Sequence, residues 1–268
     1  MQFLNDFLRS QPALDGNSPG YQNYSLFGTI AQVMMAVMVI VYLIRMKSKW
    51  LEWIKGSVIG FIAFEFCAYG QHFLMWYRSG FALDDYFQGG NIAIAFTALP
   101  LVAWLCAKTF NTSVGFAGDV ISLALLGFHF LGRSGCMFTG CCYGFPCEWG
   151  VYSHRTDANQ FPVWWIESLF TLAILVFVIV RICRKGYTPD GKNLPYFLLL
   201  YGICRFFSEF TRESTHEYWL FWRVSDIHVH MLVMAAVGGL LLWQIAKKER
   251  KSGVGEEPAL PTVKGVRK

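Results

Sequence analysis

Apolar stretches long enough to cross a lipid bilayer recur along nearly the whole chain. Hydrophobic residues make up 54% of the 268 residues and charged residues only 15%, whereas a soluble domain usually carries about 25% charged residues. A helix needs about 20 apolar residues to span the hydrocarbon core. The sequence therefore predicts an all-α membrane protein with about seven transmembrane helices, near Ser25–Arg45, Gly56–Tyr77, Asn91–Lys108, Val114–Leu131, Val163–Arg181, Leu194–Thr211 and Ile227–Ala246.

Lysine and arginine are distributed unevenly among the loops between these spans. They concentrate after the first, third, fifth and last spans, within residues 45–55, at Lys108, within residues 181–192 and within residues 247–251. Because cytoplasmic loops carry the excess of Lys and Arg, this bias predicts an N-terminus outside and a C-terminus in the cytoplasm. The net charge of +5 is accordingly interpreted as a sign of membrane topology, and no nucleic-acid partner is predicted.

The same reading divides the chain into three parts. Residues 1–24 form an extracytoplasmic N-terminal segment, and residues 25–248 form the seven-helix domain. Residues 249–268 are charged at first and then rich in Gly and Pro, a composition that predicts a disordered cytoplasmic tail.

A glycine- and cysteine-rich run, GRSGCMFTGCCYG, extends from Gly132 to Gly144 directly after the fourth predicted span. Its glycines permit tight turns and close approach of the backbone to a ligand, and Arg133 adds a fixed cation. A cation and free amide donors at a membrane surface favour a phosphate headgroup. The alternative is a capped helix end followed by an ordinary loop.

The sixth predicted span contains the densest set of polar side chains, Tyr201, Arg205, Glu209 and Arg212. At 3.6 residues per turn, these four fall on one stripe of a helix. Glu209 is spaced to pair with either arginine. Ionisable residues inside membrane spans are expensive and often functional, so the stripe is a candidate site. A structural ion pair that holds two helices together is the alternative.

Other ionisable residues inside predicted spans are possible partners for an arginine, namely Glu65, His72, Asp119, His129 and Glu167. Each one alone is more often a packing or hydrogen-bonding residue. His129 precedes Arg133 by four residues and so shares its helix face. For Asp119, near the cytoplasmic end of its span, a simple helix-terminal charge is a further alternative.

Four of the eight cysteines lie close together on the predicted outer face, at positions Cys136, Cys141, Cys142 and Cys147. Thiols outside the cytoplasm tend to be oxidised, so one or two local disulfides are expected. A zinc site is less favoured because no histidine cluster accompanies these cysteines. We predict no metal and no cofactor.

Taken together, these motifs resemble the prolipoprotein diacylglyceryl transferases of bacterial plasma membranes. The run from Gly132-Arg133-x-Gly135 through Gly140 to Gly144 is similar to the family signature. The stripe from Tyr201-Gly202 through Arg205-Phe206 and Glu209-Phe210 to Arg212 is a second match, and Pro162 followed by Glu167 is a weaker third. The resemblance covers the chain from about Tyr86 to Lys248.

One departure from the family pattern bears on catalysis. The family typically has a histidine before a Gly-Gly pair at the start of the third span, whereas here Gln88 precedes Gly89-Gly90. Glutamine donates and accepts hydrogen bonds but cannot act as a base at neutral pH. Cys136 and Cys141 likewise replace the usual Asn and acidic residue. The chain is therefore expected to be either a divergent transferase or a paralogue with another lipid substrate.

The resemblance implies transfer of a diacylglyceryl group from phosphatidylglycerol to a cysteine thiol in the signal-peptide region of a prolipoprotein, in the bacterial plasma membrane. It assigns Arg133 and Arg205 as phosphate clamps and Tyr201 as a headgroup contact, with Glu209 orienting Arg205. His129 or His72 is the candidate base. Substrate-binding roles are expected for Gln88, Gly89, Gly90, Gly140, Glu167 and Arg212.

Two alternatives remain from the residues alone. One is a non-catalytic membrane paralogue that binds an anionic lipid or a peptide through its arginines. The other is an outward-facing thiol-redox membrane protein built on the four clustered cysteines.

Overall fold

The computed structural model describes residues 2–10, 19–78, 95–140, 142–154, 156–212 and 226–251. These residues form eight helices and one two-stranded hairpin. The elements are α1 (Gln2–Ser10), α2 (Pro19–Arg45), α3 (Trp50–Arg78), α5 (Leu99–Thr109), α6 (Val114–Thr139), β1 (Pro146–Ser153), β2 (Ala158–Gln160), α7 (Val163–Arg184), α8 (Asn193–Glu209) and α9 (Asp226–Lys251).

The predicted all-α membrane class agrees with these helices. Four helices are long and apolar enough to cross a membrane: Gln22–Arg45, Val114–Thr139, Val163–Arg184 and Ile227–Lys251. The second predicted span lies within α3, whereas α5 and α8 are shorter, with 11 and 17 residues. Crossing of the membrane by all seven stays a prediction.

Helix α6 begins as its sequence suggests but ends later than predicted. Ser113 is the N-cap, and its side chain accepts a hydrogen bond from the Phe116 backbone N–H. The helix was expected to end near Leu131 but continues to Thr139, and Gly140 then adopts a left-handed φ of 58°. Much of the glycine- and cysteine-rich run is therefore helical, and only its last residues leave the helix.

Burial explains why glycines are tolerated in this last part of α6. An added Cβ at Gly135 would lie 3.0 Å from the Phe27 side chain of α2. Small residues let membrane helices approach closely. The glycine lowers the helix propensity of α6 but allows α2 to pack closely against it. The predicted span ended near Leu131, because this packing is not visible in the sequence.

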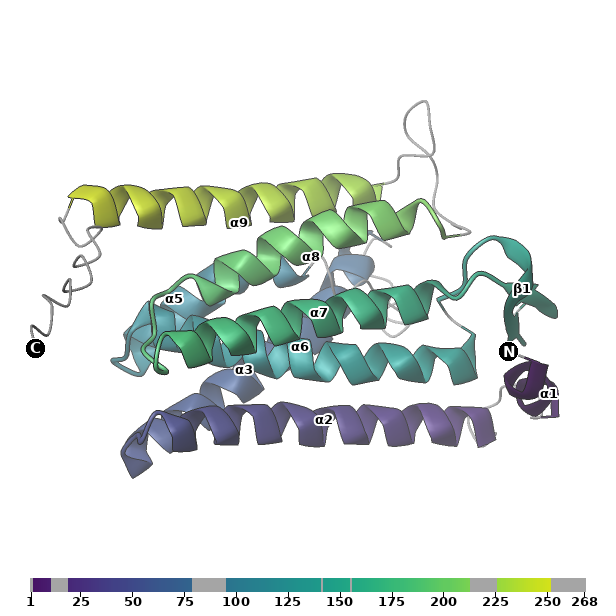
Figure 1. The fold of residues 1–268 in the computed structure, drawn as a ribbon, viewed down its shortest axis with the longest axis horizontal. Coiled ribbons are helices and arrows are strands. Elements are labelled where there is room, and N and C mark those ends of the chain that lie inside the picture. The colour runs from purple at the N-terminus through teal and green to yellow at the C-terminus, as the bar shows by residue number, and fades with distance from the viewer. Residues whose placement is uncertain are drawn as a thin grey trace, which may run out of the picture.

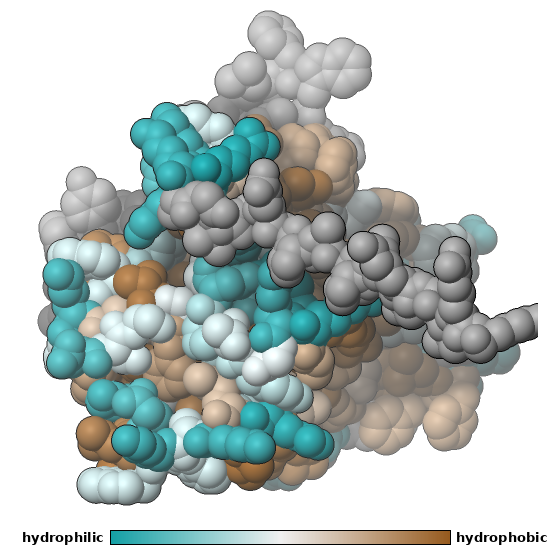
Figure 2. All heavy atoms as spheres, turned by 60° about the vertical axis from the view of Figure 1, so that its left-hand side comes forward, coloured by the Kyte–Doolittle hydropathy of each residue, from teal (hydrophilic) through white to brown (hydrophobic). Residues whose placement is uncertain are grey.

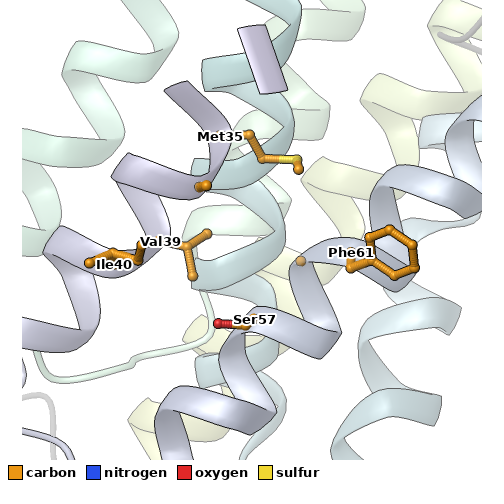
Figure 3. A pocket seen from close by; sticks show the side chains of 7 residues that line it. Met35, Val39, Ile40, Ser57 and Phe61 are labelled. Atoms are coloured by element: carbon orange, nitrogen blue, oxygen red, sulfur yellow. The ribbon is translucent and has the colours of Figure 1, made fainter. Parts of the chain in front are cut away.

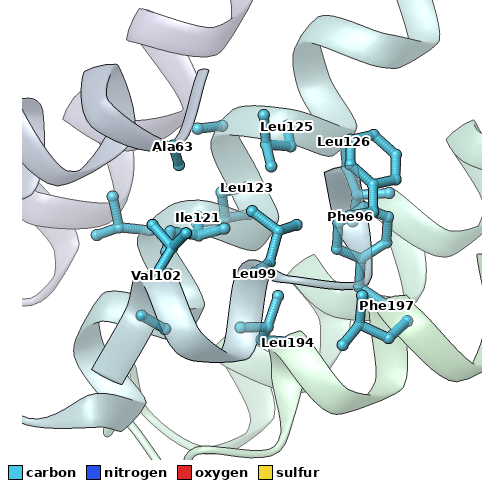
Figure 4. Packing of buried hydrophobic residues seen from close by; sticks show 14 of the residues in the cluster. Ala63, Phe96, Leu99, Val102, Ile121, Leu123, Leu125, Leu126, Leu194 and Phe197 are labelled. Carbon is cyan, nitrogen blue, oxygen red and sulfur yellow. The ribbon is translucent and has the colours of Figure 1, made fainter. Parts of the chain in front are cut away.

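Helix α6 lies at the centre of the bundle. In its most apolar window 78% of the residues are buried, against 22%, 39% and 17% in α2, α7 and α9. Figure 4 shows part of the buried hydrophobic cluster where side chains of α3, α5 and α8 meet α6. The outer helices instead expose large apolar side chains, including Val33 and Val37 on α2 and Leu232 and Leu240 on α9, as lipid contact requires.

The two ends of the bundle differ in character (Figure 1). At one end lie α1 and the hairpin, and at the other lie the last turns of α2, α7 and α9. The latter end is brought forward in Figure 2, where hydrophilic side chains gather over it and more hydrophobic ones lie along the flank. Such a polar cap beside an apolar flank is what a bilayer-spanning bundle presents.

The hairpin is tied to the end of α8. The Gly144 N–H donates to the Phe161 carbonyl at 2.9 Å, and the Phe145 N–H donates to the Thr211 carbonyl at 3.2 Å. A Cβ on Gly144 would clash with the Thr211 carbonyl, so glycine allows the two segments to meet. From this base β1 and β2 pair antiparallel, with Val151 opposite Gln160 and Ser153 opposite Ala158.

A cavity of about 200 Å³ lies between α2 and α3. Figure 3 shows its lining, which is almost entirely apolar: Met35, Ala36, Val39, Ile40, Ser57, Gly60 and Phe61. None of the predicted site residues takes part in it. Its surface suits hydrocarbon rather than a charged headgroup.

Candidate functional site

Glu167 on α7 joins three arginines at the centre of the candidate site. Its Oε2 lies 2.9 Å from Nε of Arg133 on α6, and its Oε1 lies 2.7 Å from Nη1 of Arg205 on α8. The same Oε1 lies 3.4 Å from Nη2 of Arg212, just beyond α8. The Glu167 side chain is fully buried. Glu167, which the sequence offered as a possible partner for an arginine, thus contacts three arginines at once.

The polar stripe of α8 forms as its spacing predicts. Tyr201, Arg205 and Glu209 are all buried. Arg205 Nη1 lies 2.6 Å from Glu209 Oε2, one helical turn away, and Arg212 Nε lies 3.7 Å from the same oxygen. Glu209 therefore holds Arg205 from within its own helix, while Glu167 holds it from the neighbouring helix.

Tyr201 and His129 form the inner end of the cluster. The Tyr201 hydroxyl lies 2.8 Å from His129 Nε2, and Arg133 Nε lies 3.4 Å from the same nitrogen. The aromatic ring of Phe96 packs edge-on against both His129 and Tyr201. The shared helix face of His129 and Arg133 was visible in the sequence, but the contact with Tyr201 joins segments far apart in the chain.

A cysteine thiol completes the surroundings of Arg133. Arg133 Nη1 donates to Cys142 Sγ at 2.9 Å. Cys136, Cys142 and Cys147 form no disulfide with one another, so the expected local disulfides are absent among these three. Cys141 lies outside the described residues. The buried Cys142 side chain instead helps to fix the guanidinium of Arg133.

Other predicted site residues are placed differently or lie outside the description. Gly140 occupies the left-handed position that ends α6, and its N–H donates to the Cys136 carbonyl. Its substrate-binding role stays a prediction. Gln88, Gly89 and Gly90 lie outside the described residues.

The charges of this cluster do not cancel. Three arginines face two glutamates, which leaves one net positive charge when both carboxylates are ionised. Nε and Nη2 of Arg205 are buried without a hydrogen-bond partner among the described residues, as are Oε2 of Glu167 and both carboxylate oxygens of Glu209. A buried cationic group needs an anionic partner. A net positive charge at a buried site favours an anionic ligand, and a phosphodiester is one such group.

Comparison with known proteins agrees with this chemistry. Residues 22–244 match the sequence model of the family described as prolipoprotein diacylglyceryl transferase. The chain belongs to this family. The match includes all five charged residues of the cluster as well as His129 and Tyr201.

Individual relatives carry the same description. The chain is 24% identical over 191 residues to phosphatidylglycerol–prolipoprotein diacylglyceryl transferase 2 of Clostridium perfringens, covering 68% of each protein. It is 27% identical over 173 residues to the transferase of Dehalococcoides mccartyi, covering 60% of each. A third relative, from Chlorobaculum tepidum, is 31% identical over 170 residues, covering 61% of this chain and 56% of its own length.

Proposed function

We propose that the protein transfers a diacylglyceryl group from phosphatidylglycerol to a cysteine thiol of a prolipoprotein. The observation that carries this proposal is the buried cluster of Arg133, Arg205 and Arg212, which retains a net positive charge beside Glu167 and Glu209. Within a family of diacylglyceryl transferases, such a cluster suits the lipid phosphate.

The reaction increases the negative charge that the cluster must hold. The acceptor sulfur forms a bond to the glyceryl carbon next to the phosphate, and the bond between that carbon and the phosphate oxygen breaks. Glycerol phosphate leaves as a phosphomonoester, with one more oxygen able to carry charge than the starting diester. Fixed donors aimed at a developing charge lower the barrier. Arg133 and Arg205 are proposed as these donors, because Glu167 holds both guanidinium groups in place.

The acceptor thiol must lose its proton, because the thiolate is the nucleophile. Gln88 cannot take this proton. Of the two histidines considered, we propose His129, because its Nε2 lies within 3.4 Å of Arg133 Nε and 2.8 Å from the Tyr201 hydroxyl. Tyr201 would orient the imidazole, and the base would stand beside the phosphate clamp.

The finer topology is part of the same proposal. We place the protein in the bacterial plasma membrane with seven crossings, the N-terminus outside and the C-terminus in the cytoplasm. The cation-rich ends of α2, α7 and α9 lie opposite the end that bears α1 and the hairpin (Figure 1). The reaction would then take place at the outer leaflet, since the positive-inside rule assigns the former end to the cytoplasm.

A second candidate function rests on Gln88. If the missing histidine is indispensable, the protein binds phosphatidylglycerol or another anionic lipid at the same cluster without transferring it. The two functions share the arginines and differ only in whether a thioether is formed.

A reconstituted assay tests the proposal. The purified protein in vesicles of phosphatidylglycerol and phosphatidylcholine would be supplied with a synthetic peptide that bears one cysteine. Mass spectrometry of the peptide is expected to show a thioether-linked diacylglyceryl group, together with equimolar glycerol phosphate. Arg205→Ala should abolish the product, and Arg184→Ala, at an exposed arginine of α7, should not. Lipid binding without product would establish the non-catalytic function instead.

A further inference from the structure

Helix α1 covers the outer edge of strand β1 through one side chain. Asn5 Nδ2 donates to the Gly150 carbonyl at 3.1 Å, and the Tyr152 backbone N–H donates to Asn5 Oδ1 at 2.9 Å. Both backbone groups belong to the edge that faces away from β2, because Val151 and Ser153 alternate with them in the ladder. Figure 1 shows α1 beside β1 at this end of the molecule.

The Asn5 amide reproduces the hydrogen bonds of a neighbouring strand. In a parallel ladder, one residue donates its N–H to residue i−1 of the adjacent strand and accepts from the N–H of residue i+1. The Asn5 amide does the same with Gly150 and Tyr152, on either side of Val151. The edge is therefore chemically competent to pair with an extended peptide that runs parallel to β1, as in other β-augmentation sites.

An apolar socket lies next to this edge. Leu8 of α1 is buried against Phe138 of α6 and Val151 of β1, with Phe27 and Trp164 packed around them. A peptide in the place of α1 would find both a row of backbone partners and a site for one apolar side chain. That combination selects extended apolar peptides.

The hold of α1 on the rest of the protein is limited. Besides the Asn5 amide and the Leu8 side chain, α1 contributes Leu4, which packs on the same cluster, and the Leu8 carbonyl, 2.6 Å from His154 Nε2. Arg9 bonds Asn159 at 3.3 Å and lies over the Tyr152 ring. Phe3 is 87% exposed. An incoming peptide can replace each of the Asn5 and Leu8 contacts with a similar one, so replacing α1 by the peptide costs little binding free energy.

The edge also leads toward the arginine cluster. Ser153, at the end of β1, donates from Oγ to the carbonyl of Gly140, the residue that ends α6. Gly140 follows Arg133 by about two helical turns, or about 10 Å. About three extended residues span this distance. In a peptide that runs parallel to β1, a cysteine about three residues beyond the paired segment therefore has the chain length to reach the Arg133 end of α6.

We propose that the outer edge of β1 is the docking strand for the extended segment that precedes the acceptor cysteine, and that α1 occupies this edge until the peptide replaces Asn5 and Leu8. The role of that peptide as acceptor rests on the proposed function; the docking itself does not. The competing explanation is that α1 only protects a strand edge from unwanted pairing.

Peptide binding without lipid transfer provides the first measurement. A fluorescent cysteine peptide would be titrated into the protein in phosphatidylcholine nanodiscs, which lack the diacylglyceryl donor. Asn5→Ala removes two hydrogen bonds of the competitor and should tighten the peptide dissociation constant roughly five- to tenfold. Asp6→Asn, at an exposed position of the same helix, is the matched control and should leave it unchanged. Unchanged or weaker binding by Asn5→Ala, with an unaltered melting temperature of the bundle, would overturn the proposal.

Backbone-modified peptides provide the second measurement. A series in which one amide at a time is N-methylated should bind poorly only when the methyl group falls on the residue that donates to Gly150 or on alternate residues with the same orientation. Uniform tolerance of N-methylation would exclude strand pairing. In phosphatidylglycerol vesicles, absence of thioether product from the wild type would refute the proposed function, while alternating sensitivity in the nanodiscs would still establish the docking strand.

Discussion

Replacing Glu167 by glutamine tests the central feature of the site. This change keeps the size of the side chain and removes the charge that lies 2.9 Å from Arg133, 2.7 Å from Arg205 and 3.4 Å from Arg212. The net charge of the cluster would rise from one to two. Removing one partner of a buried ion pair costs about 3–5 kcal/mol, so we expect the melting temperature to fall by roughly 6–20 °C.

The surface pair of Glu52 and Lys55 supplies the control for this experiment. These side chains lie 3.0 Å apart and are 33% and 17% exposed. Glu52→Gln makes the same chemical change, but a solvent-accessible pair contributes about 1 kcal/mol or less. Its melting temperature should therefore stay within a few degrees of the wild type.

The effect of phosphatidylglycerol on the melting temperature tests whether Glu167 only stabilises the fold or also balances the charge of an anion-binding site. Melting would be followed by intrinsic fluorescence in phosphatidylcholine micelles with and without phosphatidylglycerol. Because the anion replaces lost negative charge, phosphatidylglycerol should stabilise Glu167→Gln more than the wild type. Our reasoning fails if Glu167→Gln melts like Glu52→Gln, or if the added lipid stabilises Glu167→Gln no more than the wild type.

Three further predictions concern chemistry and topology. Arg133→Ala and Arg205→Ala should each lower the rate of transfer about a hundredfold or more, a loss of about 2–4 kcal/mol of transition-state stabilisation. Lysine at either position should restore only part of this rate, because its ammonium cannot make the bidentate contact of a guanidinium. Full transfer by both alanine variants would exclude the clamp. Gln88→His should preserve or raise the rate of product formation. If Gln88→His forms product and the wild type forms none, the native protein is a paralogue that no longer catalyses the transfer. Reporter fusions after Lys248 and within His154–Gln160 should lie on opposite sides of the membrane, and finding both on one side would rule out seven spans.

The part of the site that lies on one helix was predictable from spacing. Tyr201, Arg205 and Glu209 recur every four residues, so any regular helix aligns them, and the Arg205–Glu209 pair followed directly. The meeting of Arg133 with Glu167 depends on how α6 packs against α7. No local pattern encodes that packing, so the sequence offered Glu167 only as one of several possible partners for an arginine.

Asp119 is a second residue whose contacts with distant segments could not be read from the sequence. Of the two interpretations, a hydrogen-bonding residue and a helix-terminal charge, the first is confirmed: Asp119 is buried and accepts hydrogen bonds from the Tyr42 hydroxyl at 2.9 Å and from Asn193 Nδ2 at 2.7 Å. Its partners come from α2 and the start of α8. A carboxylate near a helix end looks the same in the sequence whether solvent or distant side chains satisfy it, so the sequence predicted a hydrogen-bonded residue without identifying its partners.

The central position of α6 has a consequence for synthesis of the protein. Translation completes α6, with His129 and Arg133, before it reaches Glu167 on α7. An unpaired arginine in a membrane helix costs up to about 2.5–3.5 kcal/mol at the translocon, the value for the helix centre, and the carboxylate that offsets Arg133 does not yet exist. We therefore expect α6 to remain at the protein-conducting channel until α7 emerges, so that the two enter the bilayer together as a helical hairpin.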